Sequence, residues 1–429
     1  MPATISETTS TTVTVSSEVG QLSRVLVHRP DKGTSRITPK RAEELLFDDI
    51  VHLPSMQREH DVFTEVLRRF VGQSGVHEVS QLFEEALDHD RDAKEEMIEL
   101  IVSWEELPDR FVSQLGNLDH KTLTEVLITG YYPPEDRVLF DPIPNFIFTR
   151  DIAITINDHL VIAKAAKLAR SRENFLTRFL MWAHPLFSPL RESGKIINLN
   201  DVNVFPPSPK GEKISIEGGD VMILNSNTVL IGTSERSSDY SARALADVLF
   251  AKNVVDTVAK VSVPADRSFM HLDTIFTQID RHDYACYKPI IMDGFNNTVE
   301  VWRKNGKTTK YASLRAYILE ELDADAKFIP AGGGRSPFQE REQWTDACNL
   351  VALRPGVALS YDRNTITEQA FEAAGYRIMG AEDLLKAMDD GIVRPDEIQK
   401  TIIALPSGEL SRGRGGSHCM TCPILREAL

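Results

Sequence analysis

Short apolar runs occur in pairs along the chain, and turn-forming residues join the two members of each pair. Asn157, Asp158 and His159 join one pair, and Pro355 and Gly356 join another. Apolar runs separated by such short links are typical of β-hairpins. Four segments show this pattern, one of them with longer arms: residues 152–163, 221–231, 350–359 and 271–291.

A helical stretch and a further apolar run follow most of these hairpins. The helical stretches cover residues 170–182, 238–252 and 366–374. The apolar runs after them cover Lys195–Leu199, Val254–Val263 and Tyr376–Met379. At the amino end, Arg24–His28 predicts a strand and Arg41–Arg69 a helix, which with the last residues would supply another copy. The pattern therefore predicts about five hairpin–helix–strand units.

Repeated units of this size cannot bury their apolar faces alone, so they usually stack on one another or close into a ring. We therefore expect an α/β fold in which the units form a ring. The alternative is a plain α+β domain in which the similar spacing is a coincidence.

Two segments do not follow the repeat. Residues 80–129 are strongly helical and charged and have no strand pattern, which predicts a separate helical bundle inserted into the repeat. Residues 1–18 are rich in Ser and Thr and lack the basic start and apolar core of a secretion signal. We expect them to be a flexible tail. The repeated units would then occupy residues 19–79 and 130–429.

Composition and charge narrow the class of protein. With 42% hydrophobic residues among 429, the chain can form a large buried core. A formal charge of −15 disfavours nucleic acid as a partner and suits a small cationic substrate. No apolar run is long enough to span a membrane. With only four cysteines, we expect no disulfide scaffold and a cytoplasmic location.

The sequence HCMTC, from His418 to Cys422, contains the first candidate for chemistry. A zinc site usually needs a second cysteine pair or added histidines, and none has the right spacing, so a metal or redox role is disfavoured. The preceding Gly-rich loop carries Arg412 and Arg414, and cations beside a thiol favour the nucleophilic thiolate. Cys419 is therefore a candidate nucleophile, although this motif alone indicates a buried structural cysteine beside a flexible loop equally well.

Three further motifs carry acid–base or charged groups. In FMHLDTIF, a strand would place His271 and Asp273 on the same face, although a lone histidine is more often structural. In IEGGD, Glu217 and Asp220 flank two glycines that allow close backbone approach, but a solvated turn would look the same. PNFIFTRD ends in Asp151 at the head of a hairpin, where a surface ion pair is the alternative.

Together these residues match one substrate. Clustered carboxylates suit a planar guanidinium, with which they form paired, charge-assisted hydrogen bonds. Clustered arginines suit a carboxylate elsewhere on the same molecule. Free arginine has both groups.

The same motifs resemble those of arginine deiminases, within the guanidine-modifying (pentein) superfamily. The resemblance runs from about Gln21 to the carboxyl end, through VLVHRP, RITPKRAEELLFDD, PNFIFTRD, IEGGD, GTSER, FMHLDTIFT, EREQWTDACN and GRGGSHCMTCP. It implies a five-bladed α/β propeller of ββαβ-type modules, with residues 80–129 as the helical bundle that distinguishes arginine deiminases from smaller relatives. GTSER and DACN depart from the commoner family sequences but contain none of the catalytic positions that the resemblance implies.

The resemblance also implies roles for individual residues. Cys419 is the expected nucleophile, His271 the general acid–base, Glu217 its orienting carboxylate, and Asp151 and Asp273 the two groups that grip the guanidinium. The expected contacts to the rest of the substrate are Asn145, Phe148, Arg170, Arg236, Arg414, Gly413 and Ile37. Cys348 is expected to be structural.

The expected reaction is hydrolysis of L-arginine to L-citrulline and ammonia through a covalent cysteine intermediate, without a metal or other cofactor. An amidinotransferase of the same superfamily and a non-catalytic arginine-binding or scaffold protein are the alternatives. The inserted helices disfavour the first, and the complete set of catalytic residues disfavours the second. We expect a homo-oligomer as the assembled form.

Overall fold

The computed structural model, which describes residues 13–429, contains five β-sheets with the same pattern of strand pairing. In each sheet, two strands pair antiparallel and the second of them pairs in parallel with a third. The parallel pairing requires a crossover connection, which helices supply. The predicted repeat of hairpin, helix and strand is therefore present, and the sheets are mixed.

One of these sheets joins strands from the two ends of the chain, and the other four begin one after another along the chain. That sheet contains β20 (Cys422–Arg426), β1 (Leu22–Val27) and β2 (Val76–Glu78). The next two contain β5 (Ala153–Ile156), β6 (His159–Ile162) and β7 (Ile196–Asn198), and then β8 (Val221–Asn225), β9 (Thr228–Thr233) and β10 (Thr257–Ser262). The last two contain β11 (Phe276–Gln278), β12 (Asp283–Cys286) and β15 (Lys327–Pro330), and then β16 (Val351–Arg354), β17 (Val357–Tyr361), β19 (Thr401–Leu405) and β18 (Arg377–Gly380).

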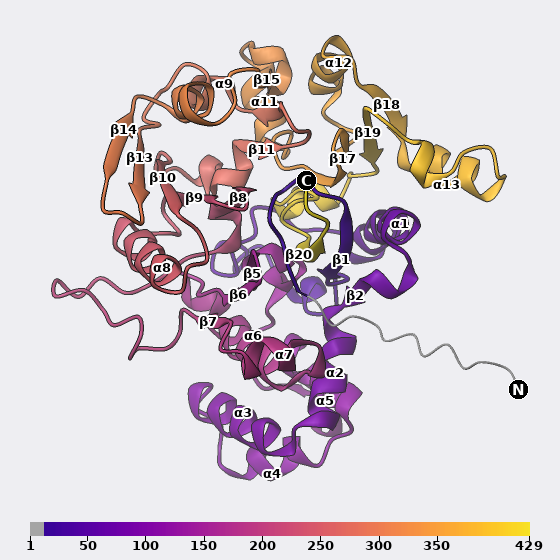
Figure 1. Ribbon diagram of the computed structural model, residues 1–429. Helices are drawn as coiled ribbons and strands as arrows, with labels where there is room; N and C mark the ends of the chain where they lie inside the picture. The colour runs from indigo at the N-terminus through magenta and orange to yellow at the C-terminus, as the bar shows by residue number, and fades with distance from the viewer. Residues whose placement is uncertain (1–12) are drawn as a thin grey trace, which may run out of the picture.

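Helices connect the parallel strands and cover the outside of the sheets. Figure 1 shows the sheets spread around the middle of the molecule, with helices further out. The main connecting helices are α1 (Leu53–Val71), α6 (Ser171–Ala183), α8 (Asp239–Ala251) and α12 (Thr365–Ala373). None of the helices described is both long and apolar enough to cross a membrane.

Two predictions of secondary structure were wrong in detail, and one hairpin was missed. Tyr376–Met379 was expected as the third strand of its unit, but β18 is partly exposed at the edge and the fully buried β19 lies between it and β17. The helix expected over Arg41–Arg69 begins only at Leu53. Pro54 lies in its first turn, where a proline needs no N–H partner, and its ring and missing N–H would disrupt a helix that continued further toward the amino end. The hairpin of β13 (Val299–Arg303) and β14 (Thr308–Tyr311), which extends the sheet of β10, was not predicted.

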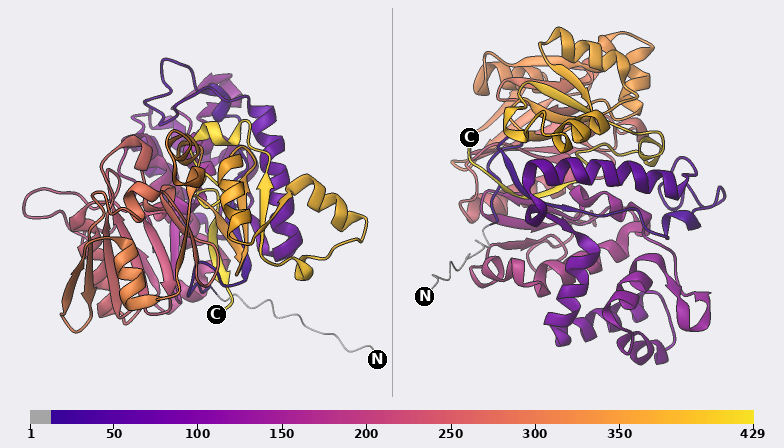
Figure 2. Two further views of the ribbon diagram at one scale, coloured as in Figure 1. Left: turned by 90° about the horizontal axis from the view of Figure 1, so that it is seen from above. Right: turned by 90° about the vertical axis from the view of Figure 1, so that its right-hand side faces the viewer.

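The inserted segment forms four helices that pack onto the repeat. They are α2 (Val79–His89), α3 (Arg91–Trp104), α4 (Arg110–Gly116) and α5 (His120–Thr129). The carboxylates of Asp90 and Asp119 cap α3 and α5 by accepting backbone N–H groups. The apolar core of these helices continues into α6, where the rings of Phe83 and Phe179 lie 5.1 Å apart. The right-hand view of Figure 2 shows these helices at one end of the molecule.

The start of the described chain is packed rather than free. The predicted tail covered residues 1–18, of which 1–12 lie outside the described residues. Thr14 exchanges backbone hydrogen bonds with Ile424 and Arg426, and Val15 with Asn157. The side chain of Glu18 is buried, and its backbone N–H donates to Ile223. Residues 13–18 therefore belong to the folded unit that joins the chain ends.

The buried residue His28 links the end of β1 to Glu78, just before the inserted helices, by a hydrogen bond. His28 Nδ1 lies 2.9 Å from Glu78 Oε1, and its Nε2 lies 3.1 Å from Asp31 Oδ2. Burial lowers the pKa of His28, but hydrogen bonds to Asp31 and Glu78 and their charges outweigh it, raising this pKa to about 10. The folded chain therefore holds a charged imidazole between two carboxylates.

We expect His28 to make the free energy of unfolding depend on pH in the alkaline range. The unfolded chain loses this proton near pH 6.5 and the folded chain near 10, so the stabilisation is complete below 6.5 and is lost as the pH rises toward 10. His28→Gln should lower stability by about 1–3 kcal/mol at pH 6, the cost of a lost charged hydrogen bond. Urea unfolding at pH 6 and pH 10 measures this. A variant equally destabilised at both pH values would contradict it.

Candidate active site

Cys419 lies between the Gly-rich loop and β20, with its thiol buried against polar groups. Asn349 holds this residue twice: its side-chain oxygen accepts the Cys419 N–H at 3.0 Å, and its amide nitrogen donates to Sγ at 3.1 Å. Sγ also lies 3.4 Å from Asp273 Oδ2. Burial, and then the negative charges of Asp273 and Asp151, raise the pKa of the Cys419 thiol well above its usual value. In this state the group is a thiol rather than a thiolate.

His271 faces Glu217, and both side chains are buried. Nε2 of the imidazole lies 2.8 Å from Oε2 of Glu217. Burial lowers the pKa of His271, but the charges of Asp151 and Glu217 outweigh it and raise this pKa to about 10. The pKa of Glu217 lies well below its usual value, because Arg170 and His271 outweigh the effect of burial. The pair is therefore an imidazolium and a carboxylate at neutral pH.

His271 and Asp273 are not on a strand, contrary to the sequence interpretation. His271 caps a short 3-10 turn, Leu272–Thr274, that contains Asp273 and comes before β11. Gly219 lets this turn pack tightly, because a Cβ atom there would lie 2.7 Å from His271 Nδ1 and 3.0 Å from Asp273 Oδ1. The IEGGD motif thus supplies both the partner of His271 and the space for its ring.

Arg170 forms hydrogen bonds with two carboxylates of the site. Its guanidinium donates to Asp151 Oδ2 at 2.7 Å and to Glu217 Oε2 at 3.3 Å. It also pairs with Glu173, a buried carboxyl whose pKa is raised to about 7, chiefly by burial. Arg236 approaches Glu217 to 3.6 Å. A substrate guanidinium could reach Asp151 only after the Arg170 side chain moves.

A small cavity of about 30 Å³ lies among these groups. That volume holds one or two water molecules, far less than a substrate the size of arginine needs. The residues that line it are Leu46, Asn145, Phe148, Asp151, Arg170, Glu217, Arg236, Met270, His271, Thr274, Gly413, Arg414 and Cys419. Asp273 and Ile37 are the two expected site residues that are missing from its walls.

The remaining expected residues have other contacts. Arg414 lies over the ring of Trp344, 3.2 Å from its centre, and 3.6 Å from Asp48. Asn145 donates to the backbone oxygen of Leu45 at 2.8 Å. Ile37 packs in a small apolar cluster with Leu45 and Phe47 instead of facing the cavity.

The sequence analysis missed several residues of this site. Leu46, Met270 and Thr274 line the cavity, and Asn349 holds Cys419. Asn349 is part of the quoted DACN sequence, and Met270 and Thr274 are part of FMHLDTIF. These motifs could therefore have indicated all three residues as part of the site. Leu46 is part of RITPKRAEELLFDD, another of the quoted motifs.

Asp151, Glu217 and His271 could also be considered as metal ligands. One ligand atom from each lies within 4.8 Å of the others. The guanidinium of Arg170 already donates to both carboxylates. It supplies the positive charge that an ion would bring.

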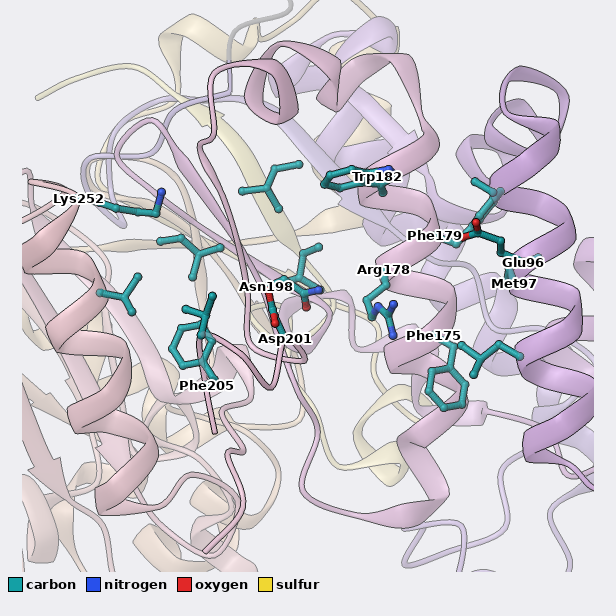
Figure 3. A pocket seen from close by; sticks show the side chains of 17 residues that line it. Glu96, Met97, Phe175, Arg178, Phe179, Trp182, Asn198, Asp201, Phe205 and Lys252 are labelled. Carbon is teal, nitrogen blue, oxygen red and sulfur yellow. The ribbon is translucent and has the colours of Figure 1, made fainter. Parts of the chain in front are cut away.

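A second, much larger cavity lies away from these residues. It measures about 680 Å³ and lies between α3, α6, β7 and α8. Figure 3 shows the aromatic rings of Phe175, Trp182 and Phe205 around it, with the charged side chains of Glu96 and Arg178. It contains no cysteine or histidine and none of the acid–base groups described above.

Comparisons with known proteins point to one family. The family model described as arginine deiminase matches residues 43–130 and 112–426. An arginine deiminase of Listeria monocytogenes serovar 1/2a is 31% identical over 445 residues, covering 97% of this chain and 98% of its own. An arginine deiminase of Bacillus thuringiensis is 33% identical over 450 residues, covering 96% and 98%.

Solved structures are more distant. The unliganded protein AgrE is 15% identical with a TM-score of 0.46, covering 94% of this chain and 40% of its own. An adduct of dimethylarginine dimethylaminohydrolase with S-methyl-L-thiocitrulline is 12% identical with a TM-score of 0.48, covering 94% and 99%. The assignment therefore depends on the sequence relatives.

The fold and site define an α/β protein with a buried cysteine, a histidine–glutamate pair and two further carboxylates. With the family match over most of its length and relatives above 30% identity, the chain belongs to the arginine deiminase family.

We expect Asn349 to control the reactivity of the Cys419 thiol. Its amide hydrogen bond lowers the pKa of that thiol, against the effects of burial and neighbouring charge. Asn349→Ala should slow alkylation of Cys419 by iodoacetamide about tenfold at pH 8, the effect of roughly one hydrogen bond. Mass spectrometry of the Cys419 peptide measures the rate. An equal or faster rate in the variant would show that the contact has no such effect.

Proposed function

We propose that the chain hydrolyses the guanidinium group of L-arginine, giving L-citrulline and ammonia. The observation that carries this proposal is a buried thiol within 3.4 Å of one carboxylate, in a cavity whose walls include a second carboxylate and a charged histidine. Incubation with L-arginine, without an added amine, tests it by assay of citrulline and ammonia. Ammonia release without an acceptor also excludes an amidinotransferase.

The substrate itself would activate the nucleophile. Asp273 and Asp151 raise the pKa of Cys419 because their negative charges oppose a thiolate. A guanidinium bound between the two carboxylates would cancel that effect and lower the thiol pKa. The enzyme would therefore hold a reactive thiolate only when arginine is bound.

The chemistry would proceed in two stages. Once arginine is bound, the Cys419 thiol releases its proton to solvent. The thiolate attacks the central guanidinium carbon, and His271 gives its proton to the departing nitrogen, which leaves as ammonia. An amidino-thioether remains on Cys419. Neutral His271 then takes a proton from water, the hydroxide adds to the same carbon, and the Cys419 thiolate leaves as citrulline forms. Glu217, which faces Nε2, would orient the imidazole in both stages.

The α-carboxylate of arginine would bind among Arg170, Arg236, Arg414 and Asn145. Arg170 and Arg236 contact Glu217 in the present structure. For both to reach the substrate carboxylate, their side chains must leave the carboxylates they now contact. Phe148 and Gly413 would pack against the aliphatic chain of the substrate, whereas Ile37 does not line the cavity and would contribute through Leu45 and Phe47, with which it packs.

Two larger features also belong to the proposal. The five sheets would close into a five-bladed propeller, which is supported by their common strand pattern and by the pairing of β1 with β20. The expected homo-oligomer in the cytoplasm remains a prediction.

We expect Cys419→Ala to abolish turnover and Cys422→Ala to leave most of it. Cys422 is buried in the apolar core beside the inserted helices, where its thiol donates to the backbone oxygen of Ala153 at 3.2 Å. Citrulline assays on both variants measure the difference. Equal loss in both, or loss of wild-type activity with a chelator, would indicate a metal or redox role instead.

We expect the protein to reject agmatine, which is arginine without its carboxylate. Arginines grouped to bind a carboxylate would be left without a partner, and sites of this kind reject such analogues by roughly 10⁴–10⁵. Arg236→Ala should therefore lower kcat/KM for arginine far more than for agmatine. Kinetics of both substrates on both proteins test this. Wild-type rates within about tenfold of each other would disprove the carboxylate site.

A further inference from the structure

The side chain of Ser234 lies just behind the wall of the small cavity in the candidate active site. Its hydroxyl oxygen accepts the backbone N–H of Arg236 at 3.1 Å. The same oxygen lies 2.9 Å from the backbone oxygen of Met270 and 3.2 Å from Oδ2 of Asp220. Arg236 and Met270 line the cavity, whereas Ser234 and Asp220 do not. One hydroxyl group therefore joins three segments of the chain around the cavity.

The first of these segments is the loop of residues 234–237, called the Arg236 loop below. Arg236 would bind the carboxylate of the substrate, and its guanidinium now lies 3.6 Å from Glu217. Ser234 also closes this loop through its backbone, since its N–H donates to the backbone oxygen of Ser237 at 2.9 Å. The direction in which the Arg236 side chain leaves the loop therefore depends on Ser234.

The second segment is the turn of residues 270–274, called the His271 turn below. The backbone oxygen of Met270, just before His271, faces the hydroxyl group described above. The backbone N–H of Leu272, just after His271, donates to Oδ1 of Asp220 at 2.9 Å. Asp220 has no exposed surface, so its carboxyl group is a fixed part of the core. The backbone is thus held from behind on both sides of the imidazole.

All the contacts of Ser234 can be hydrogen bonds at the same time. A hydroxyl has a single proton, so it can donate to only one of the oxygens of Met270 and Asp220. The Met270 carbonyl can only accept. Burial raises the pKa of Asp220 to about 7, so near neutral pH this carboxyl can itself donate to the Ser234 oxygen. Ser234 therefore links the two segments whichever partner takes its proton.

We propose that Ser234 is a positioning residue that couples the Arg236 loop to the His271 turn. It does not line the cavity, so it acts through the side chains of Arg236 and His271. The group that binds the substrate carboxylate and the group that transfers protons are thereby held in one fixed arrangement. Without the hydroxyl, the loop and the turn lose their common contact and can shift independently. The kinetic part of this inference rests on the proposed function.

Ser234→Ala removes the hydroxyl and leaves the backbone in place. KM for arginine should rise about threefold, because Arg236 is held less firmly against the substrate carboxylate. The value of kcat should fall about threefold, because His271 is held less firmly against the reacting atoms. Factors of this size correspond to the loss of about one hydrogen bond in each segment. A change in only one of the two constants would overturn the coupling.

Ser238→Ala is the matched control from the same part of the chain. The hydroxyl of Ser238 accepts the N–H of Ser241 at 3.1 Å and caps α8, and none of its described hydrogen bonds reaches Arg236 or Met270. This variant should lower the melting temperature, as the loss of a helix cap does. Both kcat and KM should stay within about twofold of the wild type. If Ser238→Ala changed both constants as Ser234→Ala does, the effect of Ser234 would be only structural and the proposal would be overturned.

A double-mutant cycle tests whether Ser234 acts on substrate binding through Arg236. In Arg236→Ala the contact with the substrate carboxylate is already lost. Adding Ser234→Ala to that variant should therefore lower kcat again, through His271, but leave KM unchanged. A further rise in KM would show that Ser234 acts on binding by another route, and would overturn the proposal.

Amide hydrogen exchange provides a readout that does not need turnover. The N–H of Leu272 donates to Asp220, which in turn contacts Ser234. In Ser234→Ala, the peptide that contains Leu272 should exchange several-fold faster, as well as the one that contains Arg236. In Ser238→Ala, the Leu272 peptide should exchange at the wild-type rate. If the wild type makes no citrulline, the proposed function is wrong, and these rates still test the coupling. An unchanged rate at Leu272 in Ser234→Ala, with the protein folded by thermal melting, would overturn the inference on its own.

Discussion

The site depends on the burial of several charges that are stable only because they face one another. An ionised side chain removed from water is costly unless an opposite charge and hydrogen bonds compensate it. Glu217 has no exposed surface and is matched by His271 and Arg170, while Glu18 is matched by Arg150. Removing one member therefore leaves another buried and unpaired, so effects on stability and on chemistry are coupled.

The same constraint explains why a guanidinium of the protein itself lies between the carboxylates of the site. A cavity lined by Asp151 and Glu217 would be unfavourable without a cation, and the guanidinium of Arg170 supplies one. In the proposed function, substrate binding would therefore exchange one guanidinium for another. Such an exchange costs less than leaving the carboxylates bare, and it favours a ligand that carries both a guanidinium and a group for the displaced arginine.

Local sequence patterns predicted the elements that depend on neighbouring residues. The hairpins β5–β6, β8–β9 and β16–β17 lie where turn residues separate apolar runs, and α6, α8 and α12 match the expected helical stretches to within one residue at each end. The order of β18 and β19 was not predictable in this way, because it depends on which apolar run is buried on both sides after the chain has folded. Likewise, Pro54 sets the beginning of α1 at Leu53, and the spacing of apolar residues alone does not reveal this boundary.

The motifs predicted most of the residues around the cavity, but not how they are held. His271 and Asp273 were grouped on the assumption of a strand, whereas a tight turn against Gly219 brings them together. Glu18 was assigned to a flexible tail, because its neighbours are Ser and Thr and its partners lie far away in the sequence. The spacing of residues within one segment of the chain does not reveal its contacts with distant segments.

The pairing of β1 with β20 has a consequence for the order in which the molecule can assemble. Leu26 lies opposite Cys422, so one edge of β1 remains without its partner strand while nearly all of the chain between them is synthesised. Contacts across such a separation form late, and an open strand edge can pair with another chain in the meantime. Since Cys419 lies three residues before the start of β20, the nascent protein would gain its candidate nucleophile and close this edge in nearly the same step.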